Sequence, residues 1–219
     1  MFGRSTTRHH RSTRGPFGPA PRVGLPRALL TYRYYALWRE FLVGLGCEVV
    51  EPPWTNQRLL DDGARVTVDD ICIPVKVFAG HLLYLRERGV DAILVPRVYA
   101  VEDTPSPRFT CPKFLGLPDL ARALVGEPPV FLDADLNVRA RPVVDTFVEI
   151  GARLGRRARA SRAAYDRALE AQAAFEAALG AGCSFRIAAA EAAHGDVGTT
   201  AERVPNAAPT DLVVATVGH

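Results

Sequence analysis

Short apolar runs alternate along the chain with longer stretches in which apolar residues recur every three or four positions. The apolar runs predict buried strands at residues 22–25, 47–51, 91–96 and 130–132. The periodic stretches predict helices at residues 28–45, 56–66, 74–88 and 118–124. Strands that alternate with helices are typical of βαβ units. We therefore expect an α/β fold: a parallel sheet of about four strands flanked by helices, flavodoxin- or Rossmann-like.

The pattern changes after residue 140. Residues 142–154 and 160–179 have the spacing of helices, residues 193–209 are small and polar, and residues 210–218 form another apolar run. We expect a disordered basic tail at 1–21, an α/β domain at 22–140 and a helical segment at 141–192 whose long second helix links or spans domains. Residues 193–219 are then a linker and the first strand of an incomplete second α/β half, because a parallel strand normally continues into a crossover.

Three segments directly follow predicted strands, at residues 26–27, 52–56 and 97–113. Ligands of parallel sheets bind beyond the carboxyl ends of the strands. The third segment has 17 residues, and loops of that length inside a domain are usually functional or disordered. The sequence therefore directs attention to this edge of the sheet.

Charge and composition narrow the classes of function. The net charge of +3 depends on five arginines within residues 1–22; the rest of the chain carries 22 basic and 24 acidic residues. A near-neutral body gives no reason to expect nucleic-acid binding by the fold. No apolar run is long enough to span a membrane, and no secretory signal is present, so we expect a cytoplasmic protein, although the arginine-rich start also fits a mitochondrial presequence.

Two cysteines have the same local sequence. Cys72 and Cys111 are each followed by a proline, then by Lys76 or Lys113, and then by a predicted helix. A thiol at a helix N-terminus favours the thiolate form, which binds iron–sulfur clusters. The alternatives are two buried small side chains, a zinc site, or a catalytic cysteine paired with His81.

Four further residues are weaker candidates. Cys47 begins the second strand and Cys183 follows the long helix, and both positions are typical of core cysteines. Arg27 and Arg97 follow strands, where an arginine holds a phosphate or carboxylate or forms a structural ion pair. Together with Lys76 and Lys113 they are the candidates for binding an anion. The glycine spacing of a dinucleotide-binding loop is absent around Arg27.

Several of these segments together resemble the acyl-CoA dehydratase activase-related proteins, a domain of unknown function associated with activators of 2-hydroxyacyl-CoA dehydratases. The resemblance rests on Gly-Leu-Pro-Arg at 24–27, Cys-Ile-Pro-Val-Lys at 72–76, His81, Val-Pro-Arg at 95–97, and Cys-Pro-Lys-Phe-Leu-Gly-Leu-Pro-Asp at 111–119. It covers about residues 22–190 and the last strand, where the sequence stops at Val-Gly-His. The longest of these motifs is the most specific.

The resemblance implies tandem flavodoxin-like domains around a cysteine-ligated 4Fe–4S cluster, as in the dehydratase subunits. It implies Cys72 and Cys111 as ligands, with Cys47 as a weak third, and leaves the ligand set incomplete in this chain. The implied partners are an ATP-dependent activator or a dehydratase subunit, with acyl-CoA as a further candidate. We expect neither nucleic acid nor membrane among its partners.

Three functions follow as hypotheses. The first is an iron–sulfur module that takes part in low-potential electron transfer to an enzyme acting on a CoA thioester. The second is a non-catalytic docking domain for the activator, with structural cysteines. The third is a CoA- or nucleotide-binding domain that uses Arg27 and Arg97. The chain has no ATP-binding signature, so it is not the ATPase; if it is an enzyme, it is a dehydratase component.

Overall fold

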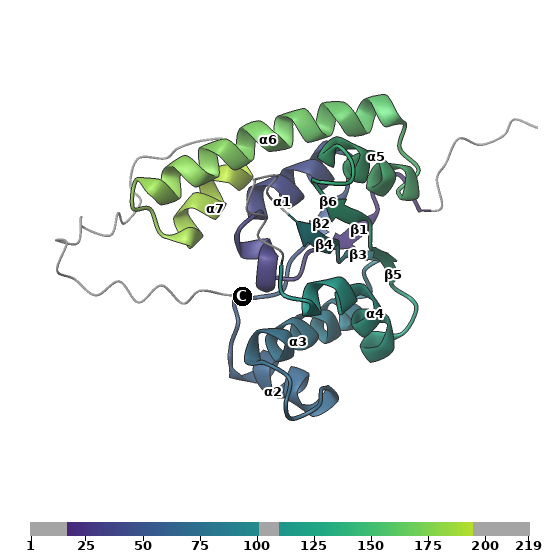
Figure 1. The fold of residues 1–219 in the computed structure, drawn as a ribbon, viewed down its shortest axis with the longest axis vertical. Helices are drawn as coiled ribbons and strands as arrows, with labels where there is room; N and C mark the ends of the chain where they lie inside the picture. Colours follow the sequence, from purple (N-terminus) through teal and green to yellow (C-terminus); the bar gives the residue numbers. More distant parts are fainter. Residues whose placement is uncertain (1–16, 101–109, 195–219) are drawn as a thin grey trace, which may run out of the picture.

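A computed structural model describes residues 17–100 and 110–194. Its main sheet has four strands in the order β2-β1-β3-β5, all parallel (Figure 1). The strands are short: β1 is Arg22–Gly24, β2 is Glu48–Val50, β3 is Ala92–Leu94 and β5 is Val130–Leu132. Because the second strand lies outside the first, this is the flavodoxin-like order. The predicted fold class and all four predicted strands are confirmed.

Helices cover both faces of the sheet, so each face has its own core. On one side lie α1 (Tyr35–Gly44), α5 (Val143–Arg153) and α6 (Ala158–Gly180), which share a core around Trp38, Phe41 and Phe147. On the other side lie α3 (Ile73–Glu87) and α4 (Lys113–Val125), packed through Phe78, Leu82 and Leu117. Figure 1 shows these two layers above and below the strands, with α2 (Gln57–Val66) packed against α3.

The helix predicted at 28–45 is two elements. Leu29–Tyr32 forms a short 3-10 helix, η1, and α1 begins only at Tyr35. Gln172 of α6 stabilises the break between η1 and α1. Its amide nitrogen donates to the carbonyl oxygen of Arg33 over 2.8 Å, and its amide oxygen accepts from the backbone N–H of Leu37 over 3.0 Å. A distant side chain thus replaces hydrogen bonds that a continuous helix would make within itself.

The segment predicted as an irregular loop at 97–113 contains regular structure. Arg97–Ala100 forms β4, which pairs in parallel with β6 (Asp135–Asn137) in a second, two-stranded sheet. Residues 101–109 of this segment are outside the described part. The helix predicted to begin at Pro118 begins at Lys113, so that Pro118 lies inside α4.

The helical segment after residue 140 packs onto the same core as the sheet. The side chains of Ala164, Ala168 and Phe175 on α6 are buried, and α6 lies along α1. A further helix, α7 (Phe185–His194), folds back against α6 and α1. The predicted basic tail at 1–21 and the strand at 210–218 fall largely or wholly outside the described residues. No helix in the described ranges is both long enough and apolar enough to cross a membrane.

Candidate functional site at the carboxyl edge of the sheet

Cys72 stands at the start of α3, as predicted. It is the N-cap residue, and its carbonyl oxygen accepts from the backbone N–H groups of Val75 over 3.0 Å and Lys76 over 3.2 Å. Pro74 occupies the first turn, where its missing N–H costs nothing. The side chain is half-buried and in the free thiol form.

Cys111 stands one residue before the N-cap of α4, which is Pro112. Its carbonyl oxygen accepts from the backbone N–H of Phe114 over 2.9 Å, and its side chain is exposed. The preceding Thr110 anchors this turn, because its hydroxyl donates to the carbonyl of Val98 in β4 over 2.6 Å. The predicted position of both cysteines at helix starts is therefore confirmed.

Topology places these two helix starts at the same edge of the sheet. After β2 and α2, α3 leads to the amino end of β3, and after β3 and β4, α4 leads to the amino end of β5. Both helices therefore begin on the side of the carboxyl ends. α3 and α4 also pack against each other on one face. Cys72 and Cys111 thus lie in one layer and at one edge, which is the edge where ligands of such sheets bind.

Cys47 does not join them. It precedes β2, at the amino edge of the sheet, and is 9% exposed. The 15 residues of α3 alone separate the two edges by roughly 22 Å. Burial raises the pKa of the Cys47 thiol to about 11, although the nearby Arg156 guanidinium acts in the opposite direction. The structure therefore gives Cys47 the surroundings of a core cysteine.

The donor set at the carboxyl edge is small. Within residues 17–100 and 110–194, no three His, Cys, Asp or Glu side chains lie close enough together to hold a metal ion. Two accessible thiols at one edge fit part of a cluster's ligand set, but a 4Fe–4S cluster usually has four thiolates. The described residues thus account for at most two of the ligands that the resemblance implies.

The two lysines and Arg97 have different surroundings. The ammonium of Lys76 donates to the carbonyl of Asp69 over 2.9 Å, beside the start of α3, and Lys113 is exposed. Arg97 is engaged by structural partners: its guanidinium donates to the carbonyl of Leu115 and to Asp119, and lies 3.6 Å from Asp135. For Arg97 the structure shows the ion-pair alternative.

His81 is fully buried in α3. Its Nε2 lies 3.1 Å from the hydroxyl oxygen of Thr55, and its Nδ1 is buried with no hydrogen-bond partner among the described residues. Burial and, as a smaller effect, the positive charge of Arg27 together lower the pKa of this imidazole to about 4. The ring's hydrogen bond goes to Thr55 rather than to a cysteine, so the geometry does not support a Cys–His pair.

A pocket with a volume of about 290 Å³ lies beyond the carboxyl ends of β1 and β2. Its lining joins residues from four separate segments: Arg27, Tyr35, Arg39, Glu51, Trp54 and Arg186. Arg27 is a predicted anion-binding residue, and its neighbours were missed by sequence reasoning. Trp54 lies in segment 52–56, which was predicted to border the ligand edge, whereas Arg186 arrives only because α7 folds back.

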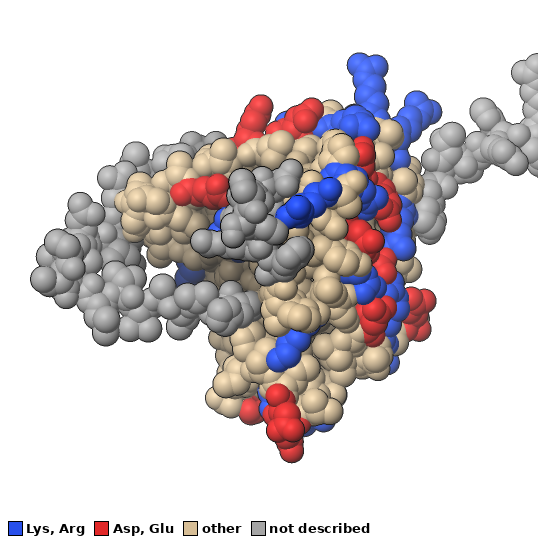
Figure 2. All heavy atoms as spheres, in the orientation of Figure 1, with Lys and Arg blue, Asp and Glu red and all other residues tan. Residues whose placement is uncertain are grey.

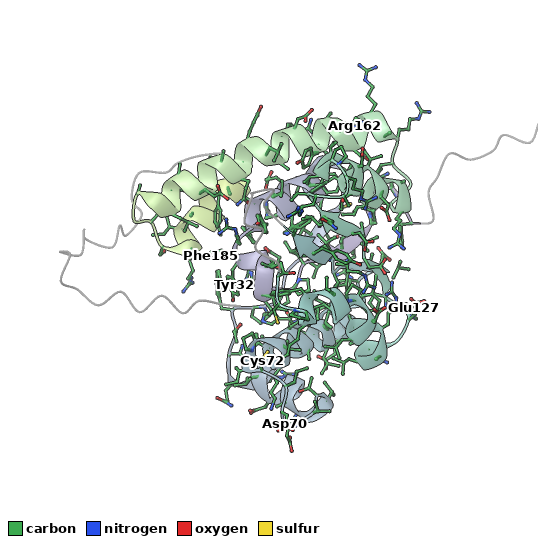
Figure 3. All side chains as sticks on the ribbon, viewed as in Figure 1. Tyr32, Asp70, Cys72, Glu127, Arg162 and Phe185 are labelled. Carbon is green, nitrogen blue, oxygen red and sulfur yellow. The ribbon has the colours of Figure 1, made fainter. Side chains whose placement is uncertain are left out.

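Aromatic rings hold α7 beside this pocket. The ring of Phe185, at the start of α7, makes edge contacts with the rings of Tyr32, Tyr35 and Trp54 at centroid distances of 5.2, 5.5 and 5.8 Å. Figure 3 shows Tyr32 and Phe185 directed toward each other, and Cys72 apart from them at the start of α3. The pocket and the cysteines are therefore two separate features of the same edge.

Charges elsewhere on the described surface are mixed. Figure 2 shows basic and acidic side chains interspersed along the side formed by α4, β5, β6 and α5. Asp133 is central to this set. Burial acts to raise the pKa of its carboxyl group, but hydrogen bonds from Arg122 and Arg153 outweigh burial and leave the pKa below its usual value. Such paired charges form no continuous basic surface on this side.

Comparison with known proteins supplies the family and no closer relative. No curated protein sequence and no solved structure matches this chain. One family model does match, and it is described as the CoA enzyme activase uncharacterised domain (DUF2229). It covers residues 22–204, from the first residue of β1 to beyond α7, and so includes Cys72, Cys111 and every residue of the pocket. The chain therefore belongs to the family of CoA enzyme activase-associated domains known as DUF2229.

Proposed function

We propose that this chain is an iron–sulfur module of a CoA enzyme activase system, in which Cys72 and Cys111 provide two of the thiolate ligands. The observation that carries the proposal is the placement of two accessible thiols at the starts of neighbouring helices, at one edge of the sheet. Membership of a CoA enzyme activase-associated family supports the setting.

The surroundings of each thiol suit an anionic sulfur. The first backbone N–H groups of a helix have no partners within the helix and carry a partial positive charge. Neither α3 nor α4 has an acidic residue in its first turn to offset it. Lys76 and Lys113 add positive charge close by. When bound, a 4Fe–4S cluster would supply one-electron transfer at low potential.

The remaining ligands come, in this proposal, from outside the described residues or from a partner protein. An apolar surface beside Cys72 supports a partner. Val66, Val68 and Ile73 are 40, 69 and 65% exposed, and they border the segment that leads from α2 to Cys72. Large apolar side chains grouped on a surface are typical of a site of contact with another protein.

The same surface supports a second candidate function, a docking domain for the ATP-dependent activator in which the cysteines are structural. The two functions differ in whether the thiols are required. With Cys72 and Cys111 as ligands, replacing both by serine removes iron. With a docking domain, the same replacement leaves partner binding unchanged, whereas Val68→Asp with Ile73→Asp abolishes it.

The test is the content of iron and acid-labile sulfide per chain after anaerobic reconstitution. We expect iron in the wild type, none in Cys72→Ser/Cys111→Ser, and wild-type content in Cys183→Ser, the control cysteine between α6 and α7. Equal iron in the double variant and the wild type would overturn the assignment of these ligands. Absence of iron from the wild type, alone and together with the activator, would favour the docking domain.

A further inference from the structure

The pocket beyond β1 and β2 is built largely from arginine and aromatic side chains. Arg27 follows β1, Glu51 and Trp54 follow β2, Arg39 lies on α1, and Arg186 lies in the first turn of α7. These segments are far apart in the sequence, and the fold brings them to one place. At 290 Å³ the pocket is near the lower end of the range for small-molecule sites, which suits a compact ligand.

Arg27 is fixed in a single orientation. Its guanidinium donates to the carbonyl of Pro52 over 2.9 Å and to the Glu51 carboxylate over 3.2 Å, and it lies 4.5 Å from the centre of the Trp54 ring. The Nε of the same side chain is buried with no hydrogen-bond partner among the described residues. Because these contacts already hold the guanidinium in place, its remaining terminal N–H groups can bind an anion with little further loss of conformational freedom.

Arg186 supplies the positive charge that no described acid neutralises. Its guanidinium lies 5.4 Å from the centre of the Trp54 ring, and within the described ranges it forms no ion pair. Glu51 is already paired with Arg27, and Arg39 with Glu40 at 2.6 Å. The lining therefore carries three arginines against one glutamate, and the first turns of α1 and α7 contain no acidic residue.

We propose that this pocket binds a phosphorylated small molecule of about the size of a mononucleotide, with the phosphate held by Arg186 and Arg27. Guanidinium groups bind phosphate through paired hydrogen bonds, and the N-terminus of α7 adds a favourable dipole. The aromatic wall formed by Trp54 and Tyr35 contacts the organic part of the ligand. The pocket shares no residue with the pair Cys72 and Cys111, so this proposal can be tested independently of the proposed cluster.

The direct test is isothermal titration calorimetry on the full chain with four probes: inorganic phosphate, AMP, ADP and coenzyme A. We expect at least one organic phosphate to bind more tightly than inorganic phosphate. Tightest binding of coenzyme A would identify a CoA-type ligand, and tightest binding of ADP a free nucleotide; either result supports the site. No binding of any probe at millimolar concentration, or equal binding of ADP, coenzyme A and inorganic phosphate, would overturn the proposal.

Arg186→Gln is the most informative variant, because this exposed side chain forms no ion pair in the described part of the chain and its loss should leave the fold intact. Loss of the hydrogen bonds between Arg186 and a phosphate should weaken the binding of the phosphorylated ligand by about 10- to 100-fold. The matched control is Arg162→Gln, an exposed arginine on α6 that pairs with Asp145. Wild-type affinity in Arg186→Gln, or an equal loss in Arg162→Gln, would contradict the assignment.

Fluorescence gives a second readout that does not depend on Arg186. The chain has two tryptophans, and Trp38 is 2% exposed and stacked on Phe147. Quenching of emission by iodide therefore reports mainly on Trp54. A ligand in the pocket should reduce this quenching, whereas unchanged quenching at a saturating ligand concentration would place the ligand elsewhere and overturn the site.

Discussion

Gly63 of α2 and Gly80 of α3 lie so close together that a Cβ atom on Gly63 would come within 2.7 Å of the backbone nitrogen of Gly80. The same Cβ would overlap the carbonyl oxygen of Lys76, and one on Gly80 would overlap the carbonyl oxygen of Leu59. The two helices thus pack backbone against backbone. This contact fixes the position of α2 and of the segment that carries Cys72 to the start of α3.

Replacing either glycine by alanine should therefore be strongly destabilising. A buried methyl group that meets backbone atoms forces the helices apart, and such overpacking costs about 3 kcal/mol. We expect Gly63→Ala and Gly80→Ala each to lower the free energy of unfolding by about this amount, measured by urea denaturation. The control is Gly116→Ala in α4, where a Cβ meets nothing within 4 Å. It should raise stability by about 0.5–1 kcal/mol through helix propensity. Similar effects at all three glycines would contradict the close contact.

His81 makes the stability of the protein dependent on pH. The unfolded chain has an ordinary histidine with a pKa near 6.5, whereas burial lowers the folded pKa to about 4. Between these values the unfolded state binds the extra proton. Protonation of His81 in the unfolded state therefore lowers the free energy of unfolding progressively as the pH falls from 6.5 toward 4, and it has no effect above pH 6.5. The shift corresponds to roughly 3 kcal/mol.

The measurement is urea denaturation of the wild type and His81→Leu at pH 7 and at pH 4.5. The wild type should lose more stability than the variant between the two conditions, and the difference isolates this histidine from the other titrating groups. An NMR titration of the imidazole should show no protonation above pH 5. An equal loss of stability in the two proteins would show that the pKa of His81 is not lowered in the folded state, which would contradict the prediction.

Sequence periodicity predicted the sheet and most helix positions, because those signals are local. The strands at 22–25, 47–51, 91–96 and 130–132 are short segments rich in apolar residues, and each occurs where the segment predicted it. The cysteines were placed at helix starts on an equally local signal, a proline in the first turn. Their position at one edge then followed from the alternation of strands and helices.

The elements that sequence reasoning missed depend on contacts between distant segments. β6 contains an aspartate and an asparagine, which are rare in strands, and forms only because β4 lies beside it. Val98 and Ala100 are buried in alternation with Arg97 and Tyr99, a period of two that could have indicated β4. The pocket was missed for the same reason, since Arg186 comes to Trp54 only through the packing of α7.

Cys47 should differ sharply from Cys72 and Cys111 in its reactivity toward iodoacetamide. Alkylation requires thiolate and access, and Cys47 has little of either, since its pKa is raised to about 11 and it is 9% exposed. Cys111 is exposed and Cys72 is half-buried. We expect Cys111 and Cys72 to be completely modified at pH 8 under native conditions before Cys47 reacts. Peptide mass spectrometry over a time course measures the extent of modification at each cysteine. Rapid alkylation of Cys47 in the folded chain would show that the amino edge is open.

Gln172 should contribute to the stability of the fold through two hydrogen bonds to the backbone. It is 6% exposed and holds the carbonyl of Arg33 and the N–H of Leu37 on either side of the break before α1. Gln172→Leu keeps the approximate volume but removes both of these hydrogen bonds. The bond to the N–H of Leu37 is buried and the bond to the carbonyl of Arg33 is part-buried, so we expect a loss of about 2 kcal/mol in urea denaturation.

Gln57→Leu is the matched control for this variant. The amide of Gln57 donates to Asp61 over 2.7 Å on the exposed surface of α2, where water replaces a lost partner. Its effect should stay within about 0.5 kcal/mol. Because Tyr35 lies in the first turn of α1 and lines the pocket, Gln172→Leu should also weaken the binding of a phosphorylated ligand. A variant as stable as the wild type would mean that α1 holds its starting position without α6.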